Sequence, residues 1–253
     1  MPRSCAERGA TMPLPTAVTD VVDVASGQVH RDEPVSPGTG GPAGNAQLTA
    51  RLGLALLVLF LAELVTLVNV RGLITWHLVI GLLLIPPSLA KTATTGWRVV
   101  RYYTGAATYR KAGAPPLLLR LLGPLVVVGT LSMLGTGLVL VALGPGPGRA
   151  ALLAVLGQQI SALTLHQAAF VLWGAATGLH VLARIVPAVR LAAPSRRAGA
   201  RLPGAVPRAG ALLATGALAA LAALVATVVL GLAAGWTDTD PGRTEQSGSI
   251  STR

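Results

Sequence analysis

The chain has 253 residues, of which 52% are hydrophobic and only 11% are charged. A soluble globular protein usually carries about 25% charged residues, so this composition excludes an ordinary soluble domain and indicates an integral membrane protein. The formal net charge is +11. It does not indicate nucleic-acid binding, because the basic residues stand between apolar blocks, as the positive-inside bias of membrane proteins requires.

Two polar tails are expected to flank a membrane domain. Residues 1–48 contain no sustained apolar run, so they cannot offset the chain entropy of folding and are predicted to form a disordered tail. They also lack the basic region followed by an apolar core that marks a signal peptide. Residues 237–253 are polar and are predicted to form a second disordered tail. Residues 49–236 are the predicted transmembrane domain.

Five apolar segments in this domain approach or exceed the ~20 residues that a bilayer core requires. They comprise residues 52–70, 73–93, 121–143, 160–184 and 209–234. The predicted fold is therefore all-α, a membrane bundle of five helices. A tight turn at Arg71 and Gly72 separates the first two segments, and Pro86 and Pro87 are expected to kink the second. The stretch AALLAVLGQQ is either an interfacial helix or an early start of the fourth segment.

The distribution of Lys and Arg predicts the orientation. The loops after the second and fourth segments hold six basic residues each, whereas those after the first and third hold one each, Arg71 and Arg149. The basic loops and the N-terminus are therefore expected in the cytoplasm, and the C-terminus outside. A composition rich in Ala, Arg, Gly and Pro is typical of bacteria with GC-rich genomes. We therefore expect a bacterial plasma-membrane protein.

The second and fourth segments carry polar residues at the same spacing. His166 and His180 lie fourteen positions apart, and so do His77 and Lys91. At about 100° per residue, each pair shares one helix face. The two segments run parallel in the predicted topology, so His77 and His166 lie at similar depths near the outer surface. Imidazole suits haem iron as an axial ligand.

The sequence therefore predicts an outer haem iron between His77 and His166. A second haem on the cytoplasmic side would use His180 and Lys91, and it would require an uncharged Lys91, because only a neutral lysine amine binds metal. Other interpretations stay open. The histidines could pack as interhelical hydrogen-bonding residues, and Lys91 could extend towards a polar interface. Glu63, within the first segment, could hold a histidine's second nitrogen or pass protons beside a quinone; it could equally be a protonated packing residue.

The stretches WHLVIGLLLIPPSLAKTATTGWRVVRYYTG and LTLHQAAFVLWGAATGLHVL resemble membrane-bound b-type cytochromes. These hold stacked haems between the helices of a bundle, and four-helix members serve as gamma subunits of formate dehydrogenases and hydrogenases. The resemblance covers about residues 50–190 and extends to uncharacterised actinobacterial membrane proteins. It implies a four-helix core with haem b and a peripheral fifth helix. Lys91 departs from the pattern, which has histidine there.

The resemblance also implies a function. We expect an electron-transfer subunit or membrane anchor that passes electrons between a quinone pool and a partner redox protein, rather than a complete enzyme. The lipid bilayer is a further partner, and nucleic acid is not. The alternative is a non-redox membrane protein, such as a small transporter, an assembly factor or a scaffold, whose histidines only pack.

Overall fold

The computed structural model describes residues 19, 22–23, 25–26, 34–193 and 202–232. Four stretches of these residues are helices long and apolar enough to cross a membrane: Gly41–Tyr103, Leu117–Leu143, Ala162–Ala192 and Ala205–Ala226. The prediction of a helical, multi-pass membrane protein is confirmed to this extent. Most of the predicted disordered tails, with Cys5 and His30, lies outside the described residues.

The first stretch consists of two long helices that fold back on each other. Helix α2 spans Gly41–Thr66, and α3 spans Val70–Tyr103. Between them lies the short 3₁₀ helix η1, Leu67–Asn69, and Leu73 in the first turn of α3 has non-helical dihedral angles. The Asn69 side chain accepts a hydrogen bond from the backbone N–H of Gly72 and so caps the start of α3. The predicted turn at Arg71 and Gly72 therefore lies within the observed break.

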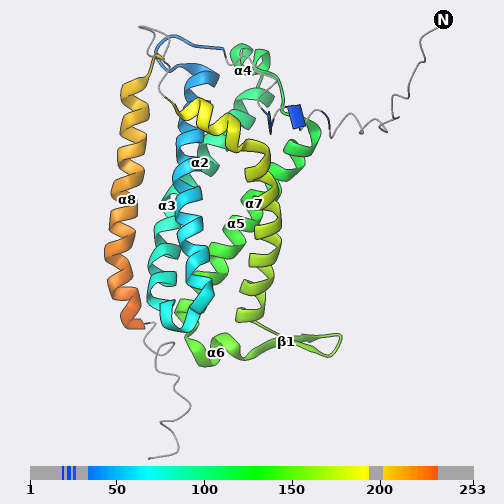
Figure 1. The fold of residues 1–253 in the computed structure, drawn as a ribbon, viewed down its shortest axis with the longest axis vertical. Helices are drawn as coiled ribbons and strands as arrows, with labels where there is room; N and C mark the ends of the chain where they lie inside the picture. Colours follow the sequence, from blue (N-terminus) through cyan, green and yellow to red (C-terminus); the bar gives the residue numbers. More distant parts are fainter. Residues whose placement is uncertain (1–18, 20–21, 24, 27–33, 194–201, 233–253) are drawn as a thin grey trace, which may run out of the picture.

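The remaining elements complete the bundle. They are α4 (Ala107–Lys111), α5 (Leu117–Leu143), α6 (Pro145–Arg149), β1 (Ala151–Val155), β2 (Gln158–Ser161), α7 (Ala162–Ala192) and α8 (Ala205–Leu232). Helix α2 packs against α3 and α7, and α5 packs against α7 and α3. Helices α3 and α7 therefore occupy opposite corners of a four-helix arrangement. Helix α8 packs mainly along the outside of α3 (Figure 1).

Several predicted boundaries were wrong. Helix α2 begins at Gly41, inside the range 1–48 predicted to be a tail, with Pro42 in its first turn, where a missing N–H costs nothing. Helix α3 continues to Tyr103, so much of the predicted loop after residue 93 is helical. The backbone keeps helical dihedral angles through Pro86 and Pro87, and the only break inside α3 is at Leu73. Residues 233 and 234 of the fifth segment lie outside the described part of the chain.

The stretch AALLAVLGQQ was predicted to be helical and is instead a β-hairpin. Strands β1 and β2 pair antiparallel, with Val155 opposite Gln158. The two residues between them, Leu156 and Gly157, both have positive φ angles of 50° and 79°. This is the backbone that two-residue hairpins favour, because its twist matches that of the strands. The fold is therefore not purely α-helical. The hairpin and α6 lie at the end of the bundle opposite α4 (Figure 1).

Trp173 joins three helices at one level of the bundle. It lies on α7 and is only 4% exposed. Its indole N–H donates a hydrogen bond of 3.0 Å to Thr130 Oγ1 on α5. Its ring centre lies 4.7 Å from that of Phe60 on α2. The α5 backbone passes close by at Gly129, because a Cβ atom there would stand 3.3 Å from Trp173 Cα and Cβ.

This close approach predicts opposite effects for two glycine substitutions in α5. Gly129→Ala should destabilise the protein by about 1 to 3 kcal/mol, because Trp173 Cα cannot move aside without separating α5 from α7. Gly135→Ala is the matched control: beyond the adjacent backbone of its own helix, no atom of the described residues lies within 4 Å of the added methyl group. Alanine favours the helix there, so stability should rise or stay unchanged. Unfolding in detergent measures both, and equal effects would contradict this packing.

Candidate functional site

The structure brings His77 and His166 together inside the bundle. His77 lies near the start of α3 and His166 near the start of α7, the two helices at opposite corners. Both helices start at the end of the bundle that holds α6 and the hairpin (Figure 1). Their ring centres are 6.4 Å apart, and the ring planes are nearly perpendicular, at 87°. The predicted meeting of these two side chains at one depth is therefore present in the structure.

The Nδ1 atom of His77 faces two oxygens from the end of α2. Glu63 Oε1 lies 2.8 Å away, and Thr66 Oγ1 lies 3.0 Å away. The Thr66 hydroxyl donates its own hydrogen to the backbone carbonyl of Glu63, at 2.6 Å. Thr66 can therefore only accept from His77, and the network assigns the hydrogen to Nδ1. In the neutral ring, this leaves the lone pair on Nε2.

The surroundings of His166 lead to the same tautomer. Its Nδ1 atom lies 3.0 Å from Thr136 Oγ1 on α5. The Thr136 hydroxyl donates to the carbonyl of Ser132 at 2.7 Å, so it too accepts from the imidazole. Gly137 lets the ring come close to α5, because a Cβ atom there would stand 3.3 Å from His166 Cε1. Both histidines thus use Nδ1 as a donor, which leaves Nε2 of the neutral ring able to bind an electrophile.

Neither Nε2 atom has a hydrogen-bond partner among the described residues. A hydrogen bond at the other ring nitrogen, from a carboxylate or a hydroxyl, is the arrangement that orients metal-binding histidines and fixes their tautomer. No group of three or more His, Cys, Asp or Glu residues in the described part of the chain is placed to hold a metal ion. The site therefore offers two imidazole nitrogens from two helices.

Glu63 is the acidic residue of this site. Its side chain is 10% exposed, and Oε2 is buried without a partner among the described residues. Of the roles left open by the sequence, holding the second nitrogen of a histidine matches this geometry. Thr66 and Thr136 were not predicted as parts of the site. Thr66 follows Glu63 by three positions and shares its helix face, so its proximity to Glu63 could have been predicted. No pattern in the sequence connects Thr136 with His166.

Lys91 and His180 lie further along α3 and α7. Lys91 Nζ is directed at α2, where it lies 3.4 Å from the carbonyl oxygen of Thr49. The absence of a side chain at Gly53 makes room for it, since a Cβ atom there would stand 2.9 Å from Nζ. The Nδ1 atom of His180 is buried and has no hydrogen-bond partner in the described residues. Lys91 is thus engaged with the backbone of α2.

Comparison with protein-family models gives no match, and comparisons with curated proteins and with solved structures give none either.

Proposed function

We propose that the chain is a b-type haem protein of the membrane, in which the Nε2 atoms of His77 and His166 would hold one haem iron. The observation that carries the proposal is the close pair of histidine rings from two helices, with both Nδ1 atoms held by oxygen acceptors. Two imidazoles that bind one metal from opposite sides, each through a nitrogen about 2 Å away, have ring centres roughly 6 to 6.5 Å apart. The observed separation is 6.4 Å.

The donor set also fits this group. Haem supplies four nitrogen ligands itself and leaves two axial positions, which a pair of imidazoles completes. When bound, haem supplies one-electron oxidation and reduction at its iron. The protein's part is to orient the ligands. Glu63 and Thr66 fix the ring of His77, and Thr136 fixes that of His166. Such partners raise the basicity of a ligand and tune the metal that it binds.

The proposed setting is a bilayer that the chain crosses five times, with α2 and α3 as separate spans and α8 outside the four-helix core. Basic residues gather at one end of the bundle. They belong to α4, to the ends of α3 and α7, and to the start of α8. The positive-inside bias places this end in the cytoplasm and the histidine pair towards the outer surface. The protein would serve as an electron-transfer subunit between a quinone and a partner redox protein.

An optical spectrum of the purified full-length protein tests this proposal. The protein should be produced with an added haem precursor, so that haem supply does not limit its content. We expect a b-type absorption band that sharpens on reduction and returns to its oxidised form with a chemical oxidant. Folded protein that shows no such band would overturn the proposal and favour histidines that only pack.

Thr136→Val tests the hydrogen bond to His166. Valine has nearly the same shape but cannot accept from Nδ1, so His166 should lose its fixed orientation. We expect haem affinity to fall by about tenfold or more, as for other partners of metal-binding histidines. Titration of haem into the apoprotein measures it.

The control is Thr215→Val on α8, which removes a hydroxyl whose one hydrogen bond within the described residues is to the carbonyl of Ala211 on its own helix. Its haem affinity should equal that of the unchanged protein. An equal loss in both variants would show that the effect is a general loss of stability rather than a loss of histidine orientation.

A further inference from the structure

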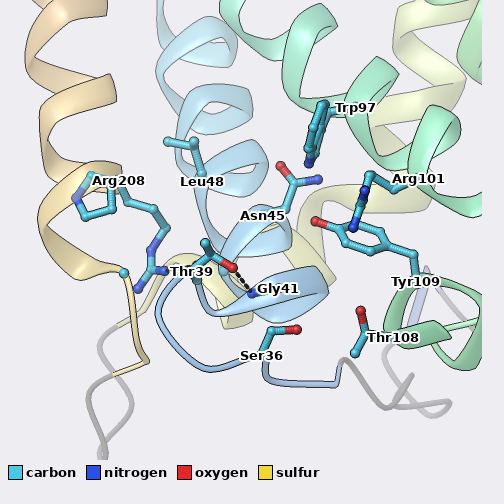
Figure 2. A pocket seen from close by; sticks show the side chains of 13 residues that line it. Ser36, Thr39, Gly41, Asn45, Leu48, Trp97, Arg101, Thr108, Tyr109 and Arg208 are labelled. Atoms are coloured by element: carbon cyan, nitrogen blue, oxygen red, sulfur yellow. Dashed lines mark hydrogen bonds between the residues drawn. The ribbon is translucent and has the colours of Figure 1, made fainter. Parts of the chain in front are cut away.

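A cavity of about 440 Å³ lies at the basic end of the bundle, far along the helices from the histidine pair. It is formed by the start of α2, the end of α3, α4 and the start of α8 (Figure 2). Arg101 and Arg208 lie on opposite sides of it in this view, and none of the described residues that line it is acidic. The described lining of the cavity therefore carries positive charge and no carboxylate.

Arg101 is held in place by aromatic rings rather than by hydrogen bonds. Its guanidinium carbon lies 5.6 Å from the ring centre of Trp97 and 5.9 Å from that of Tyr109. Both distances are within the range of cation–π attraction. Among the described residues, no atom accepts a hydrogen bond from this guanidinium group. A planar group with five N–H donors is thus oriented and left available for a ligand.

Three hydroxyl groups add to these donors. The side chains of Ser36, Thr108 and Tyr109 line the cavity, and in the described part of the chain their oxygens have no hydrogen-bond partner. Figure 2 shows the Tyr109 hydroxyl pointing into the cavity, although the residue as a whole is only 8% exposed. Hydroxyls and a guanidinium group around one space are the donors that bind phosphate oxygens.

Arg208 supplies the second positive charge and is 7% exposed. Its guanidinium group donates to the backbone carbonyls of Thr39, Pro203 and Leu202, at 3.2, 2.7 and 3.0 Å. These bonds use three of its five N–H donors and do not neutralise its charge. A buried charge is costly unless an opposite charge lies near it, so an anion in the cavity would lower this cost.

We propose that this cavity binds the phosphate group of an anionic membrane phospholipid. The position of the cavity favours a lipid headgroup over a free phosphate ion as the ligand. Trp97 is 55% exposed on the surface of a membrane-spanning helix, and Leu48 lines the same cavity, so the site is partly apolar and open at the level where headgroups lie. Basic cavities between membrane helices at the cytoplasmic side are suited to acidic lipid headgroups.

Native mass spectrometry of the full-length protein tests the proposal, with phosphatidylglycerol and phosphatidylcholine as probes. We expect phosphatidylglycerol to bind more tightly. Arg101→Gln should weaken its binding about tenfold, as expected for the loss of charged hydrogen bonds. Arg110→Gln is the matched control, because it removes the same charge from α4 without altering the lining of the cavity. Its affinity should stay within about twofold of the unchanged protein.

Two further arms make the test decisive. Arg101→Lys keeps the charge but loses the planar fork, so its affinity should be intermediate; unfolding temperatures without acidic lipid show whether each variant is folded. Inorganic phosphate at millimolar concentration should not displace the lipid. Equal losses in the Arg101 and Arg110 variants, equal binding of the two lipids, or displacement by free phosphate would each overturn the proposal.

Discussion

His166→Ala is expected to abolish the b-type absorption band of the proposed haem. The substitution would remove one of the two proposed ligand nitrogens and leave His77 as the single proposed ligand from the protein. A five-coordinate b-type haem has a different spectrum and is held more weakly, so much of it should be lost during purification. We expect less than about a tenth of the original haem content. Pyridine haemochrome assay and a reduced-minus-oxidised spectrum measure the loss.

His180→Ala is the matched control for this prediction. It removes a second, partly buried imidazole from the same helix, and it should leave the band of the His77–His166 site intact. Added imidazole should restore part of the band in His166→Ala, which separates loss of a ligand from failure to fold. Full retention of the band in His166→Ala, or its loss only in His180→Ala, would show that the haem is held elsewhere.

Trp173→Ala should produce the largest loss of stability. The side chain is 4% exposed, contacts Phe60 of α2 and bonds to Thr130 of α5, so its removal opens a cavity where three helices meet. Truncation of a buried aromatic side chain to alanine costs about 3 to 5 kcal/mol. The loss is a packing effect, because lipid chains give no hydrophobic drive for helix association. Unfolding in mixed micelles with increasing dodecyl sulfate measures it.

Two further variants test whether the contacts of Trp173 with α2 and α5 are the source of this stability. Trp76→Ala removes the same side chain from a position that is 60% exposed on α3, and it should change stability little. Trp173→Phe keeps an aromatic ring but not the N–H, so the bond to Thr130 is lost, and such bonds within membranes contribute about 0.6 kcal/mol on average. If Trp76→Ala destabilised the protein as much as Trp173→Ala, the three-helix contact would not be the source of the stability.

A succession of long apolar helices could be predicted from the sequence because a bilayer imposes a minimum length on each apolar run. Four membrane-spanning stretches are present in the described residues, and the count of five spans stays a prediction. The parallel course of α3 and α7 followed from the succession of spans, because the second and fourth crossings of a bilayer run in the same direction. The meeting of His77 and His166 followed from this course and from their depths. Both predictions rest on rules that act on whole segments. They do not depend on the detailed packing of any one side chain.

The end of α3 and the β-hairpin could not be predicted from rules that act on whole segments. Hydropathy does not mark the end of α3, because Arg98 and Arg101 continue the helix into the polar region, where water and headgroups solvate their charges. The hairpin at 151–161 was missed because ALLAV also suits a helix, and Leu156 is an unusual residue for a positive φ angle. Gly157 was the one signal for a turn.

The finer parts of the site depend on side-chain contacts that no periodicity encodes. Lys91 shares the helix face expected for a ligand, yet it donates to the carbonyl of Thr49 because Gly53 leaves space on α2. Thr136 comes to His166 from a helix with no ionisable residue near it in sequence. Such contacts arise from the pairing of α5 with α7 and of α2 with α3, which the sequence does not specify residue by residue.

Electron paramagnetic resonance of the oxidised, purified protein tests the proposed haem ligation most directly. Two axial imidazoles make ferric haem low-spin, and perpendicular ring planes make its signal strongly anisotropic. The planes of His77 and His166 meet at 87°. We therefore predict a strongly anisotropic low-spin ferric signal that disappears in His77→Ala and in His166→Ala. A high-spin signal from the unchanged protein, or the absence of any haem signal from folded protein, would contradict the account.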